Sequence, residues 1–99
     1  MSEVYTIDRL KRELRPIFQR NRVRKATLFG SYSRGEATEH SDVDLLVDSG
    51  LRGLAFFGLM DDICEALEAN VDLIDTYDII PGSPVDCEIK RTGVVLYEQ

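Results

Sequence analysis

Apolar side chains recur at intervals of three and four residues in two parts of the chain, which is the spacing of an amphipathic helix. Thr6 is placed to cap the first of these segments, and Pro16 is expected to kink or restart it. The first segment carries Ile7, Leu10, Leu14, Ile17 and Phe18. The second carries Leu54, Phe57, Met60, Ile63, Cys64 and Leu67. Each segment is therefore expected to bury one apolar face.

Four shorter segments have the alternation or apolar character of strands. They are residues 23–29, 42–47, 71–75 and 94–97. A third helix is expected to begin at Ser83-Pro84 and to end near Gly93. The order α-β-β-α-β-α-β contains no repeat and no linker. It predicts a single α+β domain over residues 1–99, with a small mixed β-sheet and helices packed against it.

The charge of the chain is divided unevenly along its length. The net charge is −6, yet residues 1–34 carry nine basic and three acidic side chains, and residues 35–99 carry three basic and fifteen acidic ones. The basic segment is either a solvated helix or a surface for phosphates or an acidic partner. The overall acidity argues against tight, non-specific binding of nucleic acid, which needs many phosphate contacts.

The sequence favours a cytoplasmic location. No apolar run approaches the roughly 20 residues that span a membrane, and residues 1–6 lack the pattern of a signal peptide. Cys64 and Cys87 form no C-x-x-C motif and no metal-binding spacing. We interpret both cysteines as small buried hydrophobic residues in a reducing compartment.

Two aspartates, Asp42 and Asp44, lie two positions apart at the start of the predicted strand 42–47. Side chains alternate along a strand, so both point to one face, about 7 Å apart, whereas Val43, Leu45 and Val47 form an apolar face. Two like charges this close raise each other's pKa unless a positive group lies between them. A hard cation such as Mg²⁺ prefers oxygen ligands of this kind. The pattern predicts a metal site, and the alternative is a solvated acidic pair.

A glycine-serine turn, Gly30-Ser31, follows the first predicted strand. Glycine allows the backbone to approach a ligand closely, and the N–H groups of the turn can hold phosphate oxygens together with the Ser31 hydroxyl. Arg34 adds a planar guanidinium suited to phosphate. The alternative is an ordinary tight turn beside a solvated arginine.

A third carboxylate comes from the segment V-D-L-I-D at residues 71–75. If this strand pairs beside 42–47, Asp72 meets Asp42 and Asp44 at one end of the sheet. Asp75 is three positions further along and is expected to face the opposite side.

Taken together, these residues form the pattern G-S-Y-S-R-G-x5-S-D-V-D-L-L-V followed by V-D-L-I. This pattern resembles the nucleotidyltransferase superfamily of DNA polymerase β, and most closely its minimal, single-domain prokaryotic members. Those members are commonly encoded beside a HEPN-domain ribonuclease toxin. The resemblance covers residues 23–75 and the closing segment 88–98, and Ser33 departs from the family's common alanine.

The resemblance implies a role for each matching residue. Asp42, Asp44 and Asp72 match the ligands of two Mg²⁺ ions, and Asp72 also matches the carboxylate that helps to remove the acceptor's proton. The residues that match the nucleotide-binding positions are Gly30, Ser31, Arg34 and Ser41. A pair of metal ions stabilises the attacking and the leaving oxygens of an in-line displacement.

The family implies transfer of AMP from ATP to a protein hydroxyl, a tyrosine of a HEPN toxin, so that this chain would act as the antitoxin. Larger relatives carry extra domains for an antibiotic, a tRNA or a primer, and this chain is expected to have none. Two alternatives remain open. The chain could occlude its partner without catalysis, or it could transfer nucleotides to RNA or an aminoglycoside. A partner or a homo-oligomer could supply the missing surface.

Overall fold

The predicted helices and strands are present in the expected order in the computed structural model, which describes residues 4–99. The expectation that residues 1–6 form no signal peptide and the predicted start of the domain at residue 1 fall partly on residues 1–3, which lie outside the described residues. Within 4–99, no helix has the length and apolar character needed to cross a membrane. The elements are α1 (Ile7–Arg20), β1 (Lys25–Phe29), β2 (Val43–Asp48), α2 (Leu54–Ala66), β3 (Val71–Asp75), the 3₁₀ helix η1 (Thr76–Asp78), α3 (Pro84–Thr92) and β4 (Val94–Glu98).

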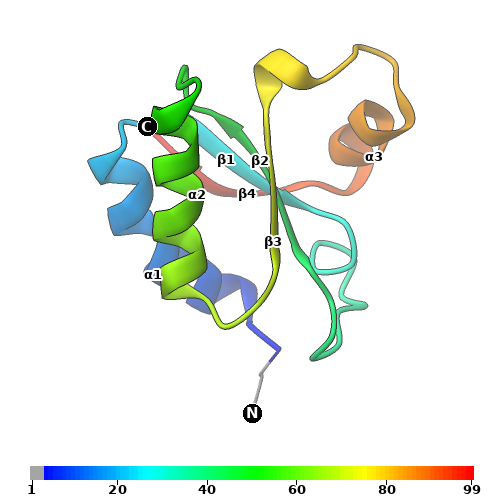
Figure 1. Ribbon diagram of the computed structural model, residues 1–99. Helices are drawn as coiled ribbons and strands as arrows, with labels where there is room; N and C mark the ends of the chain where they lie inside the picture. Colours follow the sequence, from blue (N-terminus) through cyan, green and yellow to red (C-terminus); the bar gives the residue numbers. More distant parts are fainter. Residues whose placement is uncertain (1–3) are drawn as a thin grey trace.

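The four strands form one mixed sheet in the order β3-β2-β1-β4, which confirms the predicted α+β class. β1 is antiparallel to both β2 and β4, whereas β2 and β3 are parallel. The connection between the parallel strands runs through α2. Helices α1 and α2 cover one face of the sheet, and α3 lies on the other side (Figure 1). The second face is therefore covered only in part.

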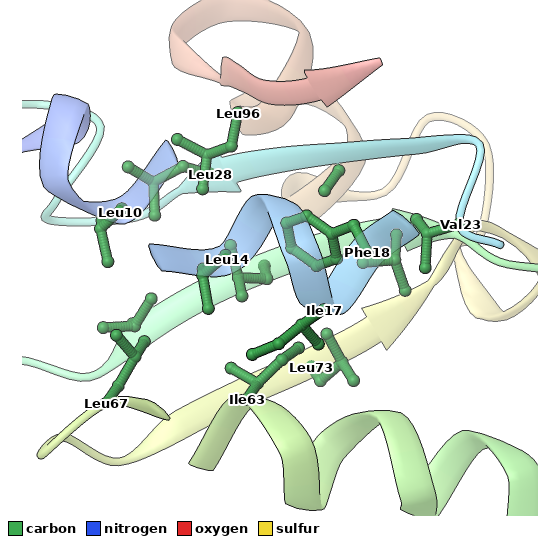
Figure 2. Close-up of a cluster of buried hydrophobic side chains, with 14 of the residues drawn as sticks. Leu10, Leu14, Ile17, Phe18, Val23, Leu28, Ile63, Leu67, Leu73 and Leu96 are labelled. Carbon is green, nitrogen blue, oxygen red and sulfur yellow. The ribbon is translucent and has the colours of Figure 1, made fainter. Parts of the chain in front are cut away.

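The core lies between the sheet and the helices α1 and α2 (Figure 2). Every second residue of β2 enters it, as the alternating pattern predicted: Val43, Leu45 and Val47 are fully buried. The helix α1 contributes its predicted apolar face, Leu10, Leu14, Ile17 and Phe18. Because one face of β2 is committed to this core, the aspartate-bearing face must point away from it.

Side-chain caps fix the helix ends that the sequence indicated. Thr6 Oγ1 accepts a hydrogen bond from the Arg9 N–H at 3.0 Å, and Ser83 Oγ accepts one from the Asp86 N–H at 3.3 Å. Gly93 ends α3, and its N–H donates to the Ile89 carbonyl at 2.8 Å. α1 continues as one helix through Pro16, whose side of the helix is exposed.

The predicted apolar face of α2 is wrong at three positions. Leu54 is 90% exposed, Phe57 is 61% exposed, and Cys64 is also exposed. The buried residues Leu59 and Ile63, together with Leu67 just after the helix, follow a spacing of four. α2 packs chiefly against α1 and β3, so a narrow stripe of side chains is enough to cover the contact.

The interpretation of both cysteines as buried hydrophobic residues is also wrong. Cys64 lies on the exposed side of α2, and Cys87 lies on the exposed side of α3. Both thiols are free. Only one face of each helix packs against the protein. The sequence does not show which face a single cysteine occupies.

Candidate functional site

The parallel pairing of β2 and β3 brings two of the predicted carboxylates together. Asp44 and Asp72 are direct partners in the register of this pair. Asp44 is half-buried and Asp72 is exposed. Asp42 was predicted to begin the strand, but β2 begins at Val43, so Asp42 lies in the end of the loop and is exposed. The three carboxylates thus occur at one end of the sheet.

Negative charge accumulates around Asp44. The pKa of Asp44 is raised to about 6, chiefly by burial and further by the charges of Asp72, Asp42 and Glu88. The positive charge of Arg34 opposes this shift but does not cancel it. The site therefore carries more negative charge than its own cation balances, and a bound cation would relieve this excess.

Gly30 allows this arrangement to form. It follows β1 with a φ of +74°, and a Cβ atom at this position would lie 2.2 Å from Asp44 Oδ2. The Gly30 carbonyl accepts hydrogen bonds from the Ser33 hydroxyl at 2.8 Å and from the Ser33 N–H at 3.2 Å. The turn that contains Ser31 is thus tied to β1, and its glycine packs directly against the Asp44 carboxylate.

Ser41 shapes the loop that leads to Asp42. Its hydroxyl accepts a hydrogen bond from the Thr38 N–H at 2.8 Å, and its own N–H donates to the Thr38 carbonyl at 3.0 Å. The same loop borders a cavity of about 380 Å³. That cavity is lined by Glu39, His40, Ser41, Glu68, Ala69 and Asn70. Ser41 therefore lines this cavity and immediately precedes Asp42 in the chain.

Arg34 is held by two glutamates. Its Nε donates to Glu36 Oε1 at 2.8 Å, and its Nη1 donates to Glu88 on α3. Glu88 is 54 positions from Arg34, and the sequence did not predict it as a site residue. The closing segment that resembles the family begins at Glu88, and this is the only signal that could have indicated it.

Asp75 belongs to the other face of β3, as the alternation predicted. It is only 6% exposed, and its Oδ2 accepts hydrogen bonds from the N–H and the hydroxyl of Ser49. Burial by itself would raise the pKa of Asp75, but these bonds and one from the Tyr77 N–H hold it below the ordinary range. Asp75 is a structural carboxylate, and Asp72 is the residue that joins the site.

This difference predicts that two substitutions in one strand affect stability to different extents. We expect Asp75→Asn to lower the free energy of unfolding by about 2 kcal/mol, because a charged acceptor of several hydrogen bonds is lost. Because the folded pKa of Asp75 is depressed, this contribution is present above the unfolded pKa of about 4 and is lost as the pH falls through the folded value. Urea denaturation at pH 7 and pH 3 measures the loss of stability and its dependence on pH. Asp72→Asn, at the exposed site, is the matched control, and an equal loss of stability there would contradict this assignment.

The case for a hard cation at the acidic site rests on the chemistry of the carboxylates and not on a converged set of ligands. Within residues 4–99, no three His, Cys, Asp or Glu side chains converge closely enough to hold a metal ion. Asp44 and Asp72 are neighbours, however, and the raised pKa of Asp44 marks excess negative charge on oxygen donors. Oxygen donors of this kind suit Mg²⁺, and Asp42 lies in a loop beside them.

Known proteins are similar to this chain in sequence and in fold. The model of the family "Polymerase beta, Nucleotidyltransferase" matches residues 12–99. MJ0435 of Methanocaldococcus jannaschii is 38% identical over 77 residues, which cover 75% of this chain and 81% of the relative. The protein adenylyltransferase MntA of Thermococcus cleftensis is 47% identical over 66 residues, which cover 65% of this chain and 64% of MntA.

A solved structure has the same arrangement of helices and strands. A crystal structure of a toxin–antitoxin with AMP-PNP superimposes with a TM-score of 0.73 and 28% identity, over 90% of this chain and 73% of that chain. The matched range of the family model contains the Gly30-Ser31 turn and all three aspartates. The chain therefore belongs to the polymerase beta family of nucleotidyltransferases.

Proposed function

We propose that this chain is a protein adenylyltransferase that transfers AMP from ATP to a hydroxyl of a partner protein, and that it acts as an antitoxin. The observation that carries this proposal is the pairing of Asp44 with Asp72 beside the Gly30 turn. The support for a protein acceptor is the similarity to MntA, which is named a protein adenylyltransferase. The support for a toxin partner is the similarity to a toxin–antitoxin structure with AMP-PNP.

In this proposal the acidic residues hold two Mg²⁺ ions. Asp42, Asp44 and Asp72 would be the ligands, and the bound metal would supply charge neutralisation at the reacting phosphate. Gly30 and Ser31 bring backbone N–H groups and a hydroxyl to the phosphates, and Arg34 and Ser41 lie on the same loop. Much of the catalysis then consists of positioning and charge neutralisation.

The transfer itself is a displacement at the α-phosphorus of ATP. The acceptor's hydroxyl oxygen forms a bond to this phosphorus, and the bond to the bridging oxygen of the β-phosphate breaks. Pyrophosphate leaves with that electron pair. In this proposal Asp72, which is exposed, takes the hydroxyl proton. The proposed acceptor is a tyrosine of a HEPN ribonuclease toxin, and the proposed compartment is the cytoplasm, where ATP is available.

The test uses ATP labelled at the α-phosphate, Mg²⁺, the chain and the partner that co-purifies with it. We expect labelled partner protein, and no label when Asp42→Asn and Asp44→Asn are combined. Mass spectrometry would then identify the modified residue. No label on a partner that still binds tightly would support occlusion instead. Labelling of added tRNA or an aminoglycoside would move the acceptor to another class.

A further inference from the structure

Arg34 is shared by two carboxylates that come from different parts of the chain. Its Nε donates to Glu36, two positions further along the same loop, and its Nη1 donates to Glu88 on α3. The side chain of Glu88 is 29% exposed, whereas that of Glu36 is 64% exposed. Both carboxylates restrain the guanidinium, and the contact to Glu88 is the one that solvent screens less.

Both members of this pair lie within electrostatic range of the acidic site. The positive charge of Arg34 lowers the pKa of Asp44, and the negative charge of Glu88 raises it. The hydrogen bond to Glu36 raises the pKa of Arg34, and the charges of Glu88 and Asp44 act in the same direction. Arg34 is thus oriented by carboxylates at the position where the proposed nucleotide would bring phosphates.

The two sides of the pair differ in how firmly they are fixed. Glu88 lies on α3, whose first turn is capped by Ser83 and whose end packs closely on β1, where a Cβ on Gly93 would lie 2.9 Å from Thr27. Arg34 lies in a loop, at the end of a long side chain. A change of partner at this pair can therefore proceed through side-chain rotation, without movement of α3.

A guanidinium that already donates to two carboxylates contributes less to binding an anion, because its charge is partly balanced and two of its N–H groups are engaged. The fork of N–H groups that Glu36 and Glu88 occupy is the same one that would bind a phosphate oxygen. Glu88 would also repel a phosphate placed beside it. We propose that Glu88 holds Arg34 in the nucleotide-free protein, and that a phosphate of the bound nucleotide replaces Glu88 on the arginine. This inference rests on the proposed function, since it assumes that the site binds a nucleoside triphosphate.

The exchange predicts a gain of affinity when the carboxylate is removed. Calorimetry with AMP-PNP and Mg²⁺ gives the dissociation constant for each variant. We expect Glu88→Gln to bind AMP-PNP about five-fold more tightly than the unmodified chain, because the competing acceptor is lost, and Arg34→Gln to bind about five-fold more weakly. In the double variant the effect of Glu88→Gln should disappear, since no arginine remains to be released.

Glu98→Gln is the matched control, because it removes the same charge at the far end of β1, where Glu98 is the partner of Lys25. The affinity of this variant for AMP-PNP should equal that of the unmodified chain. A gain similar to that of Glu88→Gln would show that net charge causes the effect, and would overturn the exchange. Equal or weaker binding by Glu88→Gln would also overturn it, as would a gain that persists with Arg34→Gln. If the unmodified chain binds no AMP-PNP, the proposed function itself fails, which distinguishes the two failures.

Discussion

We expect Asp44→Asn to lower the rate of nucleotidyl transfer by about three orders of magnitude or more, because it removes a charge at the centre of the proposed metal site. Asp44 is the half-buried member of the acidic group and is the partner of Asp72 on the neighbouring strand. Asparagine has nearly the same shape, so the loss would reflect charge rather than packing. Transfer of label from α-labelled ATP to the partner protein measures the rate.

The same substitution is expected to stabilise the metal-free protein. The pKa of Asp44 is about 6 in the folded chain, against an ordinary value of 3.8. The folded state thus holds this proton more tightly, so the contribution of Asp44 to stability is fully present below about pH 4 and is lost as the pH rises through about 6. At pH 7, Asp44→Asn should raise the free energy of unfolding by about 1 kcal/mol, after allowance for solvent screening of a half-buried group.

Urea denaturation in EDTA, at pH 4.5 and pH 7.5, checks this prediction. The difference between the variant and the unmodified chain should be larger at the higher pH. If Asp44→Asn is instead less stable at pH 7.5, the carboxylate is satisfied by contacts within the protein and the case for a cation there is lost.

Gly30→Ala is the second substitution for which we expect a large effect. The added Cβ would lie 2.2 Å from Asp44 Oδ2, so the carboxylate must move. Alanine at a φ of +74° is also strained by about 1–2 kcal/mol. A displacement of about 1 Å in a reacting group costs roughly a hundred-fold in rate, so we expect at least that loss of transfer.

Gly35→Ala separates the effect of backbone strain from the effect of the contact with Asp44. Gly35 has a φ of +72°, yet a Cβ there would meet nothing within 4 Å. It should therefore reproduce the loss of stability and retain most of the transfer activity. Thermal denaturation and the label-transfer assay, run on both variants, measure the two effects. Equal loss of activity in both variants would show that backbone strain, and not the contact with Asp44, governs the turn.

The sequence predicted which face of its strand Asp44 and Asp72 occupy, because alternation in a strand is strict. With Val43, Leu45 and Val47 committed to the core, Asp44 could point only to the other face, and the same rule separated Asp72 from Asp75. The prediction that Asp72 meets Asp44 depended on strand 71–75 pairing beside 42–47. β2 and β3 do pair, in parallel.

The remaining features depend on contacts that the sequence does not encode locally. Leu54 and Phe57 follow helical spacing, but only the partners of α2 determine which stripe is buried. Cys64 and Cys87 lie on the exposed sides of short helices for the same reason. Glu88 reaches Arg34 only because α3 returns to the sheet. Each of these facts belongs to the tertiary arrangement and not to a local pattern.

The parallel pairing of β2 with β3 also links the appearance of activity to the course of folding. Asp44 and Asp72 are partners across a connection that contains all of α2. Closing such a loop costs chain entropy before any contact repays it, so this pair forms late relative to the helices. A collapsed state with its helices formed but this strand pair open would have a core and no site. Nucleotide binding would then report completion of the native topology, and not merely the formation of secondary structure.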